Sequence, residues 1–232
     1  MPLAVLKKDL RKSIRTVLSR LPEATIASQT SAAVKTLLSM PEYKAAKRIS
    51  VYLSMPSGEV STIGIVHDAL KQGKRVFVPY TYKLTAPKDG QPKSIMDMLE
   101  LKSLDDYEKF QPDGWGIPTP SESSLSSRAN VFGGIGITEG ETSKHASEES
   151  GLDLIVMPGM AFDSNFGRLG HGKGFYDYFL QRCRDASQMP FCVGLSLTEQ
   201  FLPPTQSVPL DATDYSLDAL VLGNGDLRRA GK

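Results

Sequence analysis

A nearly continuous apolar run at Asp153–Met157 (DLIVM) constrains the fold of this chain more than any other feature. Strands that carry apolar residues on both faces are typical of parallel sheets covered by helices on both sides. Two earlier β-branched and aromatic runs, Arg48–Ser54 and Arg75–Pro79, flank Val60–Gln72, which has helical periodicity. The strand–helix–strand order predicts an α/β fold, with helices packed on the faces of a parallel sheet.

Helical periodicity also marks the N-terminal part of the chain. Apolar residues recur from Leu3 to Leu21 at steps of three and four, as an amphipathic helix requires. Pro22 separates this helix from a second one, which we expect at about Glu23–Met40 and which Pro41 ends. Beyond the apolar run, the pattern predicts a helix, a strand, a short helical turn and a last strand, at about Phe175–Arg184, Phe191–Leu197, Thr198–Phe201 and Leu217–Leu222.

The chain of 232 residues is long enough for one large domain or two small ones. Ser121–Ser150 is dominated by Ser, Gly and Glu, and we expect a flexible surface insertion that buries little. Thr81–Leu101 is expected to form a hairpin or a loop excursion, and Asp113–Pro120 is too rich in Gly and Pro for a regular element. Because the α/β pattern resumes after the insertion, we expect a single domain over residues 1–232, with a short tail after Gly225.

The charge balance excludes some classes of protein. Lys and Arg number 27 and Asp and Glu number 26, so the net charge of +1 argues against a globally basic nucleic-acid-binding protein and against an acidic disordered one. The two cysteines, Cys183 and Cys192, form no CxxC pair and suggest no disulfide framework, which favours a reducing compartment. The three histidines do not cluster with them, so we expect no zinc site.

No apolar run approaches the roughly 20 residues that span a bilayer, so we expect no membrane association. The N-terminal stretch is basic, poor in acidic residues and amphipathic, and so weakly resembles a mitochondrial presequence. The same residues form a good structural helix, so a cytoplasmic location is the main expectation and a mitochondrial one is the alternative.

The segment Gly167–Asp177 (GRLGHGKGFYD) carries the main functional signal. It lies between a buried strand and a helix, where glycines allow backbone N–H groups to converge and the helix N-terminus favours an anion. Arg168 and Lys173 add full positive charges. The loop therefore predicts a polyphosphate site, and the alternative is a tight strand-to-helix turn that is merely rich in glycine.

The loop matches neither of the two common phosphate motifs. Gly167, Gly172 and Lys173 nearly fit the Walker A pattern, but Gly174 stands where a magnesium-binding hydroxyl is needed. The dinucleotide fingerprint fails because Phe175 stands in place of its third glycine. If a nucleoside triphosphate binds, its magnesium needs other oxygen ligands, for which Asp177 and Asp214 are candidates.

The stretch Pro158–Asp177 (PGMAFDSNFGRLGHGKGFYD) resembles the signature of the 5-formyltetrahydrofolate cyclo-ligase family, also called methenyltetrahydrofolate synthetases. Four further segments match that family in the same order along the chain: Lys7–Arg11 (KKDLR), Arg48–Thr62 (RISVYLSMPSGEVST), Trp115–Pro120 (WGIPTP) and Val208–Asp218 (VPLDATDYSLD). The resemblance covers nearly the whole chain except the Ser-rich insertion and the C-terminal tail.

This resemblance implies a Rossmann-like three-layer α/β sandwich with a mostly parallel central sheet. It also implies a ligase of one-carbon metabolism, which uses ATP and magnesium to cyclise 5-formyltetrahydrofolate to 5,10-methenyltetrahydrofolate and releases ADP and phosphate. In that reaction the formyl oxygen is phosphorylated first, and nitrogen-10 then closes the ring. The implied partners are ATP and a reduced folate, with or without a polyglutamate tail, and no nucleic acid or membrane. We expect a monomer rather than an oligomer.

The resemblance further implies roles for individual residues. Asp177 and Asp214 would hold magnesium, and Lys173, Arg168 and Tyr176 would be catalytic. The folate would be bound by Leu53, Glu59, Trp115 and Phe175. ATP would be bound by two basic residues of the first helix and by the glycine loop, which are Lys7, Arg11, Arg168, Leu169, Gly170, His171, Gly172, Lys173, Gly174, Phe175 and Tyr176.

Three departures from the family pattern concern the folate. Phe175 precedes Tyr176 where a Tyr–Tyr pair is common, Tyr80 stands where many members have a basic residue, and Ile95 stands where many have histidine. Two other functions stay open from the sequence. One is a phosphate-ester or phosphosugar-binding enzyme on the same fold, and the other is a folate- or nucleotide-binding module without turnover.

Overall fold

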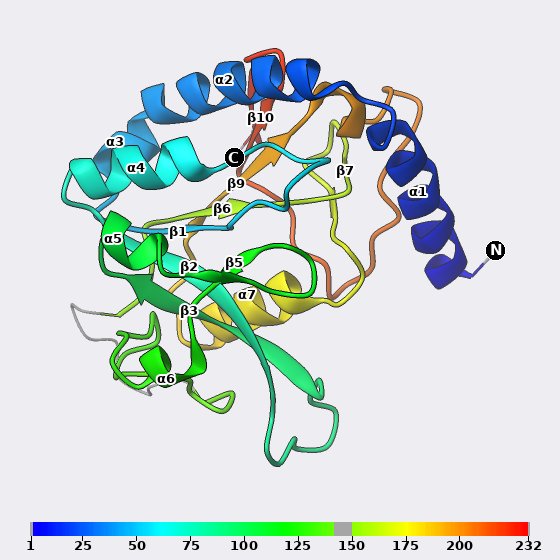
Figure 1. Cartoon of the computed structure of the whole chain (residues 1–232). Helices are drawn as coiled ribbons and strands as arrows, with labels where there is room; N and C mark the ends of the chain where they lie inside the picture. The colour runs from blue at the N-terminus through cyan, green and yellow to red at the C-terminus, as the bar shows by residue number, and fades with distance from the viewer. Residues whose placement is uncertain (1, 142–149, 232) are drawn as a thin grey trace.

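A seven-stranded sheet forms the centre of the computed structural model, which describes residues 2–141 and 150–231 (Figure 1). The strand order is β11-β10-β9-β6-β1-β2-β3. The five inner strands are parallel, whereas β3 and β11 pair antiparallel at the two edges. The strands are β1 (Arg48–Val51), β2 (Arg75–Lys83), β3 (Ser94–Leu101), β6 (Leu154–Met157), β9 (Phe191–Ser196), β10 (Ala219–Leu222) and β11 (Leu227–Arg229).

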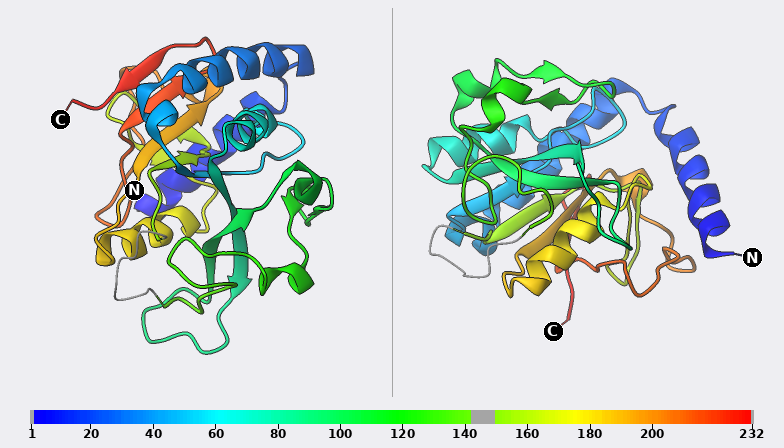
Figure 2. Two further views of the ribbon diagram at one scale, coloured as in Figure 1. Left: turned by 90° about the vertical axis from the view of Figure 1, so that its left-hand side faces the viewer. Right: turned by 90° about the horizontal axis from the view of Figure 1, so that it is seen from below.

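Helices cover both faces of this sheet, so the structure has the three α/β/α layers that we expect from the sequence (Figures 1 and 2). Strand β6 shows why its sequence is apolar throughout. Leu154 and Val156 belong to the core beneath the N-terminal helices, and Ile155 and Met157 belong to the core beneath α7. The helices of the sandwich are α1 (Leu3–Leu18), α2 (Glu23–Ser39), α3 (Pro41–Ala45), α4 (Ile63–Lys71) and α7 (Phe175–Asp185).

The remaining elements are short and lie in the connections. They are α5 (Leu104–Tyr107), β4 (Gln111–Pro112), β5 (Pro118–Thr119), α6 (Glu122–Leu125), β7 (Ala161–Phe162), β8 (Arg168–Leu169) and the 3-10 helix η1 (Thr198–Gln200). Helix α1 lies against β7 and η1, which brings the N-terminal segment beside the loops that follow β6 and β9. Among the described residues, no helix combines the length and apolar character needed to cross a membrane.

The hairpin expected within Thr81–Leu101 is present, because β2 and β3 pair from Val76 opposite Leu101 to Lys83 opposite Ser94. Strand β2 runs past Pro79, where we expect it to end. Its parallel partner β1 pairs only as far as Phe77, so the missing N–H of Pro79 falls beyond the shared part of that ladder.

The expectation that Ser121–Ser150 buries little is wrong for its described part. Four residues there are at most 3% exposed, and the segment extends the ladder of β3, since the Val131 N–H donates to the Met98 carbonyl and Asn130 bridges Leu99. Its polar composition is compatible with burial because the polar groups are hydrogen-bonded within the fold. Residues 142–149 of the expected insertion lie outside the described part. The four buried residues are Arg128, Asn130, Val131 and Phe132.

The chain after Gly225 also differs from the expected tail. Leu227–Arg229 forms β11, which pairs antiparallel with β10 and so closes that edge of the sheet. All three residues of β11 are exposed, and two of them are arginines. Such a short strand lacks the apolar alternation by which a strand is identified in a sequence.

Candidate active site

A cavity of about 470 Å³ lies where α1 meets the glycine loop and the first turns of α7. The loop follows β6 from its carboxyl end, which is the usual position of ligand sites in open α/β sheets. Both positive and negative side chains face this cavity. It is lined by Ala4, Lys7 and Arg11 of α1, by Leu169, Gly170, Gly172 and Gly174 of the loop, by Asp177, Tyr178 and Gln181 of α7, and by Thr213 and Asp214.

The two basic residues expected on the first helix reach the cavity together. Lys7 and Arg11 lie one turn apart on the same face of α1. The Arg11 Nε donates to the Gly170 carbonyl at 2.7 Å, and the Lys7 Nζ lies 2.5 Å from Asp214 Oδ2 and 3.1 Å from Asp211 Oδ2. Burial alone would lower the pKa of Lys7, but the hydrogen bonds and charges of Asp214 and Asp211 outweigh it and raise the pKa. Lys7 therefore stays positively charged beside the cavity.

The glycine loop requires its glycines for two separate reasons. Gly174 has φ +68° and immediately precedes α7, so a left-handed residue begins the helix. Gly172 has φ +102°, and a Cβ there would lie 3.3 Å from Arg11 Cζ. Lys173, between these two glycines, and His171, which precedes them, are exposed. The loop thus presents backbone and one flexible ammonium next to a helix N-terminus, an arrangement suited to phosphate groups.

Arg168 lies beneath the loop and is not among the residues that line the cavity. Its guanidinium is 3% exposed, donates through Nη2 to Asp177 Oδ1 at 3.0 Å, and lies 5.5 Å from the centre of the Tyr176 ring. Within the described part of the chain, Arg168 Nε has no hydrogen-bond partner. The structure therefore places Arg168 where it orients Asp177.

The two carboxylates expected to hold a metal, Asp177 and Asp214, line the same cavity. Each is already oriented, Asp177 by Arg168 and by the Tyr215 N–H, and Asp214 by Lys7 and the Asp211 N–H. Among the described residues, no group of three or more His, Cys, Asp or Glu side chains is placed to hold a metal. Two carboxylates fit magnesium that arrives with phosphate oxygens, since this ion is commonly bound by one or two carboxylates plus substrate phosphates.

A second group of predicted residues gathers around Glu59. Its side chain is only 7% exposed and accepts a hydrogen bond from the Met55 N–H, and burial raises the pKa of Glu59 to about 7. Burial also raises the pKa of Tyr176, an effect that the positive charge of Arg168 opposes and the charge of Glu59 reinforces. The charges of Glu59 and Arg168 therefore both act on Tyr176, which packs against both cores of the domain.

The loop that carries Trp115 packs against the segment that carries Glu59. A Cβ on Gly116 would lie 2.8 Å from Pro56 Cγ, and Asp113 Oδ1 accepts the N–H groups of Trp115 and Ile117, which fixes the turn. Trp115 is 64% exposed, while Leu53 at the end of the β1 segment is buried. Leu53, Glu59 and Trp115 thus belong to neighbouring segments, with a large aromatic face open to solvent.

The structure adds cavity residues that the sequence analysis does not single out. Tyr178 and Gln181 lie four residues after Gly174 and Asp177, so helical spacing from the loop is a signal that identifies them. Asp211 does not line the cavity but contacts its residue Lys7, and no local signal identifies it because the two are 204 residues apart. Its pKa is lowered to about 2 by hydrogen bonds from the hydroxyl and N–H of Thr213 and from Lys7.

Known proteins resemble this chain over nearly its whole length. The model of the 5-formyltetrahydrofolate cyclo-ligase family matches residues 4–223. A probable 5-formyltetrahydrofolate cyclo-ligase of Schizosaccharomyces pombe is 31% identical over 221 residues, covering 93% of this chain and 94% of the relative. The 5-formyltetrahydrofolate cyclo-ligase of Mus musculus is 30% identical over 217 residues, covering 93% and 92%. The NMR structure of Aquifex aeolicus 5,10-methenyltetrahydrofolate synthetase has a TM-score of 0.65 and 26% identity, covering 98% of this chain and 94% of that one.

Proposed function

This chain belongs to the 5-formyltetrahydrofolate cyclo-ligase family, and we propose that it converts 5-formyltetrahydrofolate to 5,10-methenyltetrahydrofolate with ATP and magnesium as co-reactants. One observation carries the proposal. A single cavity joins Lys7 and Arg11 with the glycine loop, a helix N-terminus and two oriented carboxylates. That combination suits a triphosphate with its metal better than a phosphate monoester, which needs no second carboxylate.

The phosphate side of the site acts through position and charge. Phosphoryl transfer depends mainly on orienting the reactants and neutralising charge, so it needs no protein nucleophile. We assign the cationic contacts to Lys7, Arg11 and the exposed Lys173, and the backbone contacts to residues 169–174. Asp177 and Asp214 would hold magnesium, which supplies neutralisation of the phosphate oxygens when bound. Arg168 contributes by orienting Asp177.

The folate side is assigned to the region of Glu59. An ionised carboxylate is a pure acceptor, so Glu59 suits the donor-rich edge of a pterin ring. Trp115 would form a wall against the flat ring, and Leu53 and Phe175 would supply apolar contact. We assign Tyr176 to the boundary where the formyl group meets the terminal phosphate, because it belongs to the glycine loop segment and the charge of Glu59 acts on it.

The proposed reaction has two steps, phosphoryl transfer and ring closure. The formyl oxygen attacks the γ-phosphorus, the bond to the β-phosphate oxygen breaks, and ADP leaves. Nitrogen-10 then attacks the activated formyl carbon and loses its proton, the carbon–oxygen bond breaks, and inorganic phosphate leaves with the electron pair and takes up the proton. The chain's own residues bind and orient both substrates and keep the reacting oxygen close to the γ-phosphorus.

The test is a direct assay of the purified chain with 5-formyltetrahydrofolate. Formation of the methenyl product, followed by its near-ultraviolet absorbance, is expected only when both ATP and magnesium are present. Product without ATP would overturn the proposed phosphorylation step, and no product at high enzyme concentration would overturn the proposed activity.

The proposed partners are ATP and the reduced folate, and the proposed active form is a monomer in the cytoplasm. Cys183 and Cys192 are buried free thiols, which supports a reducing compartment. Gel filtration of the purified chain and localisation of a fluorescent fusion test these two points.

A further inference from the structure

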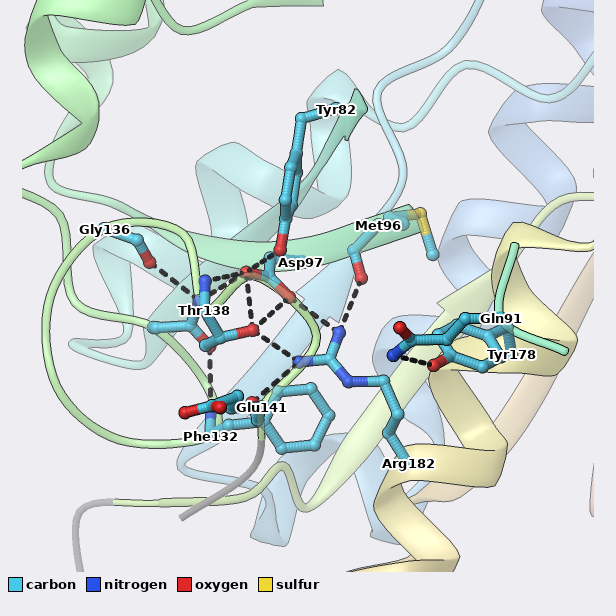
Figure 3. Close-up of polar contacts among 11 residues, drawn as sticks. Tyr82, Gln91, Met96, Asp97, Phe132, Gly136, Thr138, Glu141, Tyr178 and Arg182 are labelled. Carbon is cyan, nitrogen blue, oxygen red and sulfur yellow. Dashed lines mark hydrogen bonds and ion pairs between the residues drawn. The ribbon is translucent and has the colours of Figure 1, made fainter. Parts of the chain in front are cut away.

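A buried polar cluster on the side of α7 next to the hairpin is not explained by the proposed reaction (Figure 3). Its centre is an ion pair between Arg182 Nη1 of α7 and Asp97 Oδ1 of β3, at 2.7 Å. Both side chains are nearly inaccessible, since Asp97 is 0% and Arg182 3% exposed. A buried ion pair often contributes no more stability than an apolar pair of similar volume, so its presence calls for another explanation.

The cluster joins three segments that are distant in the sequence. Arg182 also donates through Nη2 to Thr138 Oγ1 at 2.6 Å and to the Glu141 carbonyl at 3.1 Å, and it lies 4.2 Å from the centre of the Phe132 ring. Asp97 accepts further hydrogen bonds from Tyr82 and Thr138 (Figure 3). It also accepts one from Asn130. Helix α7 is therefore attached by directional bonds to the hairpin and to the segment 130–141.

A second bond attaches the same face of α7 one turn earlier. Gln91, in the loop of the β2–β3 hairpin, donates through Nε2 to the Tyr178 hydroxyl at 3.0 Å (Figure 3). Gln91 also lies close to the segment 130–141, because a Cβ on Gly140 would lie 3.0 Å from Gln91 Nε2. Tyr178 and Arg182 are four residues apart and so share one face of the helix.

The face of α7 next to the one that carries Tyr178 and Arg182 lines the cavity proposed to bind the nucleotide. Asp177 and Gln181 are also four residues apart, and both face the cavity with Tyr178. The apolar residues of α7 pack without strong directionality, whereas hydrogen bonds fix rotation and translation along the axis. The bonds of Tyr178 and Arg182 therefore set where Asp177 and the loop ending at Gly174 are placed.

We propose that Arg182 and Gln91 are positioning residues for the nucleotide site: they hold α7 by the face next to the one that lines the cavity, so that Asp177 and the glycine loop meet the phosphates and their metal. This inference rests on the proposed use of the cavity for MgATP. It predicts that loosening the cluster weakens MgATP binding much more than folate binding, because Leu53, Glu59 and Trp115 lie outside α7 and, of the residues assigned to the folate, Phe175 alone lies on that helix.

The main variant is Arg182→Met, and Arg128→Met is its matched control. Arg128 is another 3% exposed arginine that pairs with an aspartate, Asp106, and anchors the same segment, but it makes no contact with α7 among the described hydrogen bonds. We expect Arg182→Met to raise KM for MgATP about tenfold, with KM for the folate changed less than about twofold. Arg128→Met is expected to lower the thermal midpoint without raising KM for MgATP. Equal increases in the two variants, or a wild-type KM in folded Arg182→Met, would overturn the proposal.

A variant with a smaller expected effect on folding tests the proposal if Arg182→Met does not fold. Gln91 lies in a loop and does not line the cavity, so Gln91→Leu removes the bond to Tyr178 without touching the site. We expect KM for MgATP to rise about threefold, and no further rise when Gln91→Leu is added to Tyr178→Phe. An unchanged KM, or fully additive effects, would contradict the positioning role.

Hydrogen exchange separates this proposal from the proposed function. Amides of residues 174–178 are expected to exchange faster in Arg182→Met than in the wild type, and at the wild-type rate in Arg128→Met. That comparison needs no substrate, so it tests the placement of α7 even if the wild-type chain proves not to use ATP. Unaltered exchange at these amides in Arg182→Met would overturn the inference.

Discussion

The ammonium of Lys7 lies 2.5 Å from the carboxylate of Asp214, although 207 residues separate the two in the chain. This ion pair fixes the N-terminal helix against the last loop before β10 and forms one wall of the cavity. Lys7 also contacts the exposed Asp211, so the two aspartates share one partner. Only Asp214 lines the cavity, so the pair allows a metal-binding role to be separated from a role in holding Lys7.

Asp214→Asn is expected to raise the magnesium concentration needed for half-maximal activity at least about tenfold, since the loss of a charged contact is worth about 1.5–3 kcal/mol. The measurement is activity against magnesium concentration at fixed ATP. Asp211→Asn is the control, because it weakens the hold on Lys7 but leaves the cavity carboxylates unchanged. If the two variants shift the magnesium requirement equally, Asp214 is not a metal ligand.

Lys173→Ala is expected to lower kcat/KM for ATP by about 10- to 100-fold, because a charged hydrogen bond contributes about 1.5–3 kcal/mol. Lys173 is exposed, so the thermal midpoint should stay that of the wild type. Steady-state kinetics measure the effect, with Lys71→Ala on the exposed side of α4 as the matched control. Wild-type kinetics in Lys173→Ala would show that the phosphates contact other residues.

Glu59 makes the stability of the fold depend on pH. Its pKa is raised by burial from 4.5 to about 7, so the folded state binds a proton more tightly than the unfolded state. This contribution is present below pH 4.5 and is lost as pH rises to about 7, a change of about 3 kcal/mol. Urea denaturation should therefore show that Glu59→Gln gains stability relative to the wild type between pH 4.5 and 8. A difference that is constant over this range would mean that Glu59 titrates normally.

The same carboxyl predicts the pH dependence of folate binding. If the pterin is bound by ionised Glu59, the proton must leave when the folate binds, and KM for the folate should rise about tenfold for each pH unit below about 7. KM for MgATP serves as the internal control, because Glu59 does not line the nucleotide cavity. A folate KM that stays constant from pH 5.5 to 7.5, while turnover is retained, contradicts this role.

Phe132→Ala is expected to destabilise the fold by about 3–5 kcal/mol, because a large buried aromatic side chain is lost from the core beneath α7. Ile135→Ala in the same segment is the control, since Ile135 is 68% exposed and Phe132 only 3%. Chemical denaturation measures both. Equal small effects would show that the segment contributes little to the core.

By the same reasoning, removal of residues 121–150 should destabilise the whole domain.

The local signals in the sequence predict most of the fold. Apolar residues at Leu154–Met157 and helical spacing in Leu3–Leu18 report burial directly, so the parallel sheet and its helices follow from them. Strands β7 and β8 have two residues each and β11 three exposed ones, too few for any periodicity to register. The buried part of Ser121–Ser150 also escapes prediction, because its burial depends on hydrogen-bond partners in β3 and α7.

The sequence by itself determines the α/β class, the position of the glycine loop, the family and the identity of the charged residues around the cavity. The fold class and the loop depend on residues that are close together in the chain, and the family follows from several short segments, each of which matches by itself. Only the tertiary structure decides that Lys7 meets Asp214, that Arg168 lies beneath the loop, and that Asp97 of β3 pairs with Arg182 of α7. The reason is physical: an ion pair between distant segments forms only when packing of the two cores brings those segments together, and no local pattern records that packing.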